Sequence, residues 1–134
     1  MRLPATLFWS FLVLNFPLAA FAQAQSPAEQ FKSLYAEWNS LEKKLTDLRE
    51  EYGQSTGEKR TQTRRQYEQA LEQSNDLLPK LGSVAEEAYL AAPNKDADVL
   101  RTLLGIMAYH YRRDEYEAVL KLAKLLEDNK CTEA

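Results

Sequence analysis

The sequence has very few of the residues that build metal centres and disulfides. Its 134 residues include one histidine, His110, and one cysteine, Cys131. A zinc site takes about three or four protein ligands, so His110 alone cannot form one, and we predict a polar or half-buried position for it on a helix. Cys131 cannot form a disulfide within its own chain. An intermolecular disulfide, a reactive thiol and a half-buried position after a helix stay open for it, and the sequence favours the last. We therefore expect no metal and no cofactor.

Side chains placed for catalysis are also lacking. Glu86 and Glu87 are adjacent, so on a helix they point in different directions and cannot act as a facing acid–base pair. The serine residues have no base partner in any recognisable motif. The sequence therefore predicts no catalytic residue in this chain, and it leaves open whether the chain belongs to a larger enzyme.

An excess of positive charge is absent as well. The chain has 17 basic and 20 acidic residues, which gives a net charge of −3. Arg60, Arg64 and Arg65 form the only basic cluster, and we interpret them as a solvated helix face. A nucleic-acid surface would need many more basic residues on one face, so the composition excludes nucleic acid as the partner.

Helix-breaking residues are scarce, with 4 glycines and 5 prolines. Alanine, leucine, glutamate, glutamine and lysine dominate instead, and these residues have high helix propensity. The sequence therefore predicts an all-α fold, made of a kinked antiparallel helical hairpin followed by a tetratricopeptide-like pair of helices.

Residues 1–24 have the pattern of a cleavable signal peptide. A basic residue, Arg2, precedes an apolar run at 6–14, and small-x-small cleavage sites end at Ala22 and Ala24. The alternative is a retained membrane anchor, but polar and helix-breaking residues leave the run short of the ~20 apolar residues that a spanning helix needs. We expect export to the periplasm or the extracellular space, with no stable membrane anchor after cleavage.

Residues 25–92 are predicted to form the hairpin. Ser26 and Glu29 have the spacing of a capping box at the start of its first helix, and Gly53 is expected to end that helix in the left-handed conformation. The apolar positions between them follow a heptad pattern of alternating spacings of 3 and 4, which is typical of a coiled-coil seam. They are Phe31, Leu34, Trp38, Leu41, Leu45, Leu48 and Tyr52.

The second helix of the hairpin is predicted to begin near a second capping box, Ser55 with Glu58. Its seam has matching spacings, and Pro79 lies inside it, where we expect a kink rather than an end because the apolar phase continues. The predicted seam consists of Tyr67, Leu71, Ser74, Leu78, Leu81, Ala85 and Ala88.

Residues 93–134 are predicted to form two shorter helices. Asn94 is the expected N-cap of the first, Asp114 and Glu117 would form a third capping box at the start of the second, and Asn129 would end it in the left-handed conformation. The predicted core faces are Leu100, Leu103, Leu104, Met107 and Tyr111 on the first helix, and Val119, Leu122, Ala123 and Leu126 on the second.

This helix pair resembles a tetratricopeptide repeat, a helix–turn–helix unit of about 34 residues. With Ala118 at the small position of the second helix, Tyr109 falls on the aromatic position of the first helix and Leu122 on the large apolar position. The stretch "RDEYEA" is similar to the usual turn. Leu125 stands where a second small residue is expected, and no proline closes the unit. We interpret 93–134 as a degenerate and truncated repeat.

A wider resemblance covers roughly residues 27–131. The phrases "LLPKL", "AYLAAPN" and "RDEYEAVLKLAKLLEDN", with their spacing, resemble the N-terminal helical region of secreted bacterial cyclophilin-type peptidyl-prolyl isomerases. The resemblance implies further repeat-like helices and then an isomerase domain. The catalytic cyclophilin barrel has no counterpart in this sequence, so no catalytic residue is carried over.

The last predicted helix contains the stretch "VLKLAKLL", which is apolar nearly all round. A helix at the end of a repeat needs either a polar outer face or a neighbour, so we predict an interaction surface at Leu120, Leu122, Leu125 and Leu126, covered by a partner protein or by further repeats. The favoured function is an exported interaction module without catalysis of its own. The alternatives are the leading part of a secreted isomerase and a self-associating coiled-coil scaffold.

Overall fold

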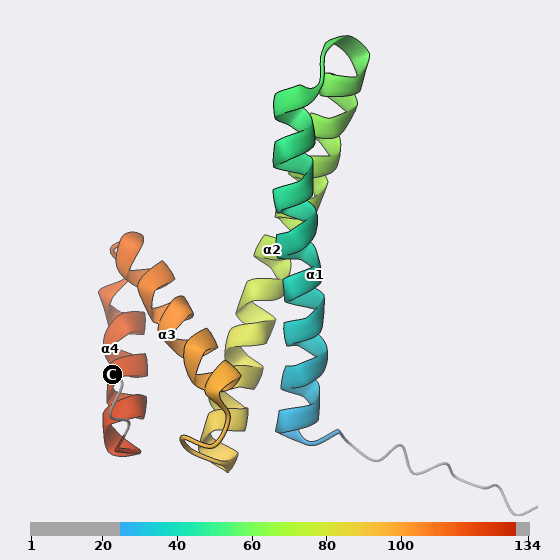
Figure 1. Ribbon diagram of the computed structural model, residues 1–134. Helices are drawn as coiled ribbons and strands as arrows, with labels where there is room; N and C mark the ends of the chain where they lie inside the picture. Colours follow the sequence, from blue (N-terminus) through green and yellow to red (C-terminus); the bar gives the residue numbers. More distant parts are fainter. Residues whose placement is uncertain (1–24, 131–134) are drawn as a thin grey trace, which may run out of the picture.

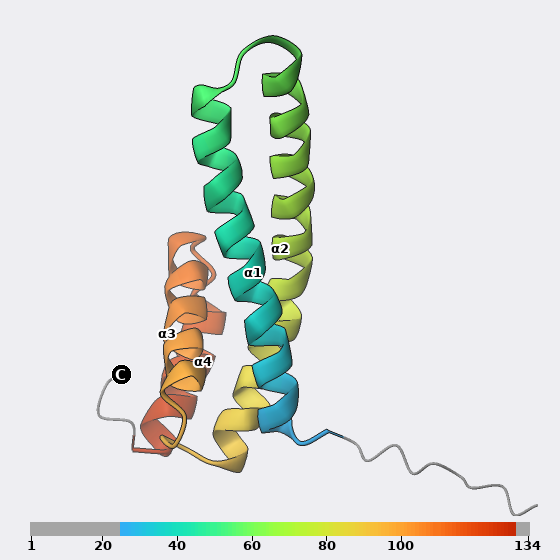
Figure 2. The ribbon, with the colours of Figure 1, turned by 45° about the vertical axis from the view of Figure 1, so that its right-hand side comes forward.

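The computed structural model describes residues 25–130, and all of the regular structure in this range is helical. The helices are α1 (Pro27–Gln54), α2 (Gly57–Ala91), α3 (Ala97–Arg112) and α4 (Tyr116–Asp128). The long helices α1 and α2 form an antiparallel hairpin, and α3 and α4 pack beside its lower half (Figures 1 and 2). The all-α prediction, a hairpin followed by a helix pair, is confirmed. Ala22, Ala24 and Cys131 lie outside the described residues.

The start of α1 is built by the predicted capping box. The hydroxyl of Ser26 accepts from the backbone N–H of Glu29 at 3.3 Å, and the Glu29 carboxylate accepts from the backbone N–H of Ser26 at 2.9 Å. These hydrogen bonds favour the charged carboxylate, so the pKa of Glu29 lies below its usual value. Pro27 occupies the first helical position, where its missing N–H costs no helical hydrogen bond.

The turn between α1 and α2 differs from the prediction. α1 continues through Gly53 to Gln54, and the left-handed residue is Gly57, with φ of 59°, at the start of α2. The hydroxyl of Ser55 donates to the carbonyl of Glu51 at 2.6 Å, so it caps no N–H of α2 and the second capping box is absent. A serine hydroxyl can satisfy either helix end, and here it closes the helix that precedes it.

Part of the α2 face that packs against α1 is shifted by one residue from the prediction, because Ala70 and Leu77 are buried in place of Leu71 and Leu78. Leu45 and Leu48 of α1 are buried against Ala70, with Tyr67 packed beside them, whereas the predicted Leu71 is 40% exposed. The observed row on α2 continues through Ser74, Leu77 and Leu81. Small residues in this row let the two helices approach closely, and that packing outweighs the greater hydrophobicity of Leu71.

α2 passes through Pro79 without a break, as predicted, and its second half runs in a different direction from its first (Figures 1 and 2). The second half packs against α3. Gly82 is buried there, and a Cβ on it would lie 3.2 Å from Cδ1 of Ile106. The absence of a side chain at Gly82 therefore lets α3 pack closely on the redirected part of α2.

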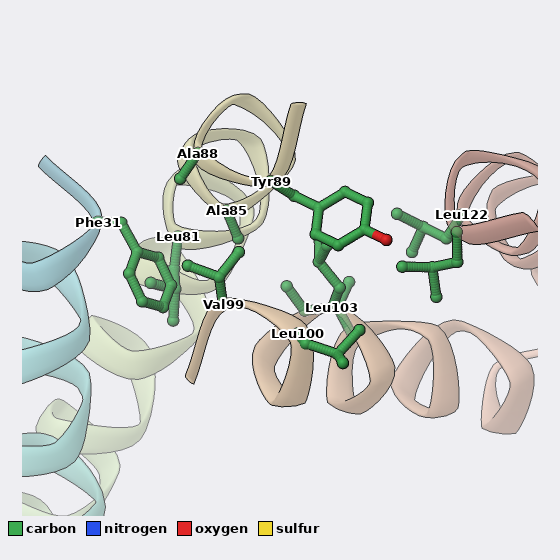
Figure 3. Packing of buried hydrophobic residues seen from close by; sticks show 11 residues of the cluster. Phe31, Leu81, Ala85, Ala88, Tyr89, Val99, Leu100, Leu103 and Leu122 are labelled. Carbon is green, nitrogen blue, oxygen red and sulfur yellow. The ribbon is translucent and has the colours of Figure 1, made fainter. Parts of the chain in front are cut away.

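The main core lies where this part of α2 meets the other three helices. Figure 3 shows Phe31 of α1 directed toward Leu81, and Tyr89 of α2 extending between α3 and Leu122 of α4. The buried members are Phe31, Leu81, Ala85, Ala88, Tyr89, Val99, Leu100, Leu103, Ile106, Leu122 and Leu126. Tyr111, predicted to be in the core, is 62% exposed, because α3 turns its Val99–Ile106 row toward α2 instead.

The ends of α3 and α4 also differ from the predictions. Asp96 caps α3, whereas Asn94 is left-handed and its side chain accepts from the Tyr89 hydroxyl at 2.9 Å and donates to the Asn129 carbonyl at 2.9 Å. Asn94 therefore ties the α2–α3 loop to the end of α4.

The start and end of α4 depend on neighbouring residues. Glu115, rather than Asp114, is its N-cap residue and makes no side-chain cap bond, so the third capping box is absent. Asp114 is left-handed and accepts from the Tyr116 hydroxyl at 2.7 Å. At the other end the left-handed residue is Lys130, not Asn129. Asn129 is still the C-cap residue, and its side chain donates to the carbonyl of Leu125 in the last turn of α4 at 2.8 Å.

Candidate functional site

The four leucines predicted as an interaction surface do not share one surface. Leu122 and Leu126 are buried in the main core, and Leu125 packs against it half-buried. Leu120 is the one with a free face, with 69% of its side chain exposed. α4 buries the row formed by Leu122 and Leu126, which are one turn apart, so Leu120 points away from α3.

Two tyrosines lie near Leu120, where α3 ends and α4 begins. The rings of Tyr111 and Tyr116 meet edge to face, with centroids 6.0 Å apart, and Leu120 follows Tyr116 by one helical turn. All three side chains are exposed. We call Tyr111, Tyr116 and Leu120 the α4 patch.

A larger feature is a groove between α1 and α3, with α2 as its floor. Figure 1 shows α1 and α3 on either side and α2 behind them. The cavity has a volume of about 320 Å³, at the lower end of the range found for ligand sites. We call it the α1–α3 groove. Its lining consists of Tyr35, Trp38 and Asn39 of α1, Leu78 and Leu81 of α2, and Arg101, Thr102, Gly105, Ile106, Tyr109 and Arg112 of α3.

The shape of the α1–α3 groove follows from two features of the sequence. The first half of α1 carries Tyr35 beside Leu34 and Trp38, which makes its apolar stripe wider than the seam with α2 needs. On the opposite wall, Gly105 is exposed and nothing lies within 4 Å of the position its Cβ would take. The aromatic side chains of α1 therefore face α3 at a position, Gly105, that has no side chain.

The charged side chains of the groove are all positive. Arg101 donates to Asp98 at 2.7 Å, and both side chains are largely exposed. Arg112 uses its Nε to donate to the Ala108 carbonyl at 3.3 Å, and within residues 25–130 no carboxylate forms an ion pair with it. No aspartate or glutamate of the described part of the chain lines the groove.

A second cavity, of about 380 Å³, lies between α2 and α4 on the other side of α3. It shares Leu78, Ile106 and Tyr109 with the α1–α3 groove. Lys121 of α4 and Glu86 of α2 form an ion pair at 2.8 Å in its lining. This cavity is already bridged by that contact, so it is less open to a partner than the α1–α3 groove.

His110 lies half-buried on α3, as predicted. Its Nδ1 is 2.6 Å from the Glu115 carboxylate, which also accepts from Nε of Arg113 at 2.8 Å. Hydrogen bonds from Arg113 and from His110 hold the pKa of Glu115 below its usual value. The three side chains close the α3–α4 turn, which gives His110 a structural role.

The far end of the hairpin carries a small cavity of about 170 Å³ lined by Arg49, Tyr52, Arg64 and Tyr67. Arg49 donates to the Tyr67 hydroxyl at 3.2 Å, and Arg64 pairs with Glu68 at 3.7 Å. Arg64 belongs to the predicted basic cluster, and all three arginines of that cluster are exposed, as expected of a solvated face. The two arginines that line the cavity, Arg49 and Arg64, are thus already engaged with neighbouring side chains of the hairpin.

No group of three or more histidine, cysteine, aspartate or glutamate side chains within residues 25–130 is arranged to hold a metal ion. None of the helices in that range is both long enough and apolar enough to cross a membrane.

The α1–α3 groove was not predicted from the sequence. Trp38 was assigned to the seam, and Tyr109 to packing within the repeat. The signals that could have indicated the groove were the widened aromatic stripe at Tyr35 and Trp38 and the glycine in the middle of α3. Comparison with known proteins gave no match among family models, curated proteins or solved structures.

Proposed function

We propose that this chain is an exported helical interaction module, which binds a segment of a partner protein in the α1–α3 groove. The observation that carries the proposal is an open groove whose walls present Tyr35, Trp38 and Tyr109 from two helices. Aromatic side chains contribute large contact areas at low entropic cost, and they are enriched at binding hot spots. Paired helices that stand side by side commonly bind protein segments on a concave face.

The decisive test fills the groove without disturbing the fold. Residues 25–134 include both hydrophobic clusters found in the described part of the chain, so they are suitable for expression. A leucine at Gly105 meets open space and improves helix propensity, so Gly105→Leu is expected to keep the melting temperature or raise it slightly. The new side chain would occupy the groove and weaken peptide binding by about tenfold or more.

The measurement is selection of peptides from a random displayed library on the wild-type protein, followed by titration. Trp38 is the only tryptophan outside residues 1–24, so its fluorescence reports on the groove. Gly53→Leu is the matched control, because Gly53 also has open space around its Cβ position but lies at the far end of α1. Equal binding by Gly105→Leu and wild type would overturn the proposal, as would a library that yields no ligand.

The proposed location outside the cytoplasm rests on residues 1–24. We expect mass spectrometry of the protein recovered from the producing cell to give a mature N-terminus at Gln23 or Gln25, following cleavage at Ala22 or Ala24. Recovery of a chain that still begins at Met1, in a membrane pellet, would contradict export.

The α4 patch is a second place where a partner protein or further repeats would pack. Its exposed Tyr116 and Leu120 lie on α4, the outer helix of the pair, and Tyr111 joins them from the end of α3. The outer helix is the side on which a repeat stacks on its neighbour. Light scattering on the purified protein separates this proposal from the coiled-coil scaffold alternative, because self-association would raise the mass with concentration.

The resemblance to secreted cyclophilin-type isomerases supports a second candidate, the leading part of such an enzyme. In that setting the helices would hold a protein substrate near an isomerase domain, and the Gly105→Leu variant would lower binding of that substrate in the same way.

A further inference from the structure

We propose that the segment bound in the α1–α3 groove is acidic, with one large apolar side chain between carboxylates. This inference rests on the proposed function and names the chemistry of its partner. The charged groups of the groove are Arg101 and Arg112, and no carboxylate of the described chain accompanies them in its lining. The whole chain carries a net charge of −3, so this local positive charge opposes the overall balance. Charge complementarity therefore favours an acidic occupant.

The two arginines stand at opposite ends of one wall. Arg101, Gly105, Tyr109 and Arg112 follow one another at helical spacing on α3, and all four line the groove. With a rise of about 1.5 Å per residue, the two arginines are roughly 16 Å apart along the helix axis. The first and fifth residues of an extended segment are about 13 Å apart, and the lengths of the arginine and glutamate side chains cover the remaining few ångströms. The spacing thus suits a carboxylate at each end of a five-residue stretch.

Arg112 is the stronger of the two anchors. Its Nε is used by the Ala108 carbonyl, which leaves the two terminal nitrogens to receive a carboxylate from a partner. Arg101 already contacts Asp98, but exposed ion pairs of this kind contribute little to stability, so its guanidinium can also serve a bound carboxylate.

The large apolar side chain of the bound segment would pack between the two arginines, on the floor of the groove. Leu78, Leu81 and Ile106 form it, and the rings of Tyr35 and Trp38 stand beside it. The open position at Gly105 is opposite α1 and between the arginines, about 6 Å along the helix axis from Arg101 and about 10 Å from Arg112. A phenylalanine or leucine of the bound segment would enter here and remove apolar area from water on both sides. Two arginines are too few to follow a nucleic-acid backbone, so the occupant is a polypeptide.

The test uses three blocked peptides of about five residues with a central phenylalanine and glutamate, glutamine or lysine at both ends. Trp38 fluorescence at low salt gives each dissociation constant. We expect the glutamate peptide to bind about tenfold more tightly than the glutamine peptide, and the lysine peptide to bind most weakly. The preference for glutamate should fall as salt is raised, because the arginines are exposed.

Arg112→Gln is expected to abolish most of the preference for glutamate, whereas Arg112→Lys should retain part of it, since lysine keeps the charge but not the two parallel hydrogen bonds. Arg65→Gln is the matched control, because it removes the same charge from an exposed site on α2 outside the groove. Loss of the preference in both glutamine variants would indicate a general charge effect and overturn the inference.

The remaining outcomes separate this inference from the proposed function. If the glutamine peptide binds as tightly as the glutamate peptide, and Gly105→Leu weakens both, the acidic chemistry is wrong and the groove function stands. The acidic chemistry is also wrong, and the groove function again stands, if the only peptides that bind are library peptides without carboxylates and Gly105→Leu weakens their binding. If no peptide of any chemistry responds to Gly105→Leu, both fail.

Discussion

Replacing Leu103 by alanine is expected to lower the free energy of unfolding by about 3–5 kcal/mol. Leu103 is 0% exposed and lies at the centre of α3, where Figure 3 shows it among side chains from α2 and α4. Removal of its branched end leaves a cavity that rigid helices on two sides cannot close. Urea denaturation followed by circular dichroism measures the change, with the slope of the transition used to check that unfolding stays two-state.

Leu120→Ala is the matched control for this experiment. It makes the same substitution in the neighbouring helix α4, but at a side chain that is 69% exposed. We expect a change of less than about 0.5 kcal/mol, as is usual for exposed positions. A large loss for Leu120→Ala would mean that the α4 patch is covered in the folded protein, by a second copy or by residues outside 25–130.

Leu45→Ala is expected to cost about 2–3 kcal/mol, the lower end of the range for buried leucines. Leu45 is 6% exposed and packs with Leu48 and Ala70 in the cluster that joins α1 to α2. That cluster lies between two helices only, so water reaches part of the vacated space and the cost is smaller than at Leu103. The urea concentration at the midpoint of unfolding should fall for Leu45→Ala, and it should fall less than for Leu103→Ala.

The register of the hairpin is tested by Leu71→Ala in the same series. Leu71 belongs to the seam predicted from the heptad pattern, but the structure exposes it and buries Ala70. A change below about 0.5 kcal/mol supports the observed register. A loss at Leu71→Ala as large as that at Leu45→Ala would contradict it and restore the predicted seam.

Leu71 is exposed and Ala70 is buried, although the heptad pattern predicted Leu71 in the seam. The heptad analysis followed the alternating spacing of 3 and 4 and placed Leu71 in the seam. The same rule worked on α1, where Leu45 and Leu48 are indeed buried. On α2 it failed because a close seam between two helices needs small residues at the points of contact. Hydrophobicity by itself does not encode that distance, which depends on both helices together.

The α1–α3 groove was harder to predict for a related reason. Trp38 and Tyr35 are close to each other on α1, and Gly105 is visible in the sequence as an exception within a helix. Their meeting depends on the direction that α2 takes after Pro79 and on the approach of α3 at Gly82. A groove formed by three helices is thus a property of their relative placement, which no local pattern specifies.

The sequence by itself determined the helical class, the hairpin followed by a helix pair, the capping box at Ser26 and the passage of α2 through Pro79. These features follow from local propensity and from interactions between residues a few positions apart. Only the tertiary structure decided which face of α2 meets α1, that Asn94 binds the end of α4 instead of capping α3, and that Tyr111 is exposed rather than in the core. In these cases several local solutions had similar energies, and the choice among them came from packing between helices distant in the sequence.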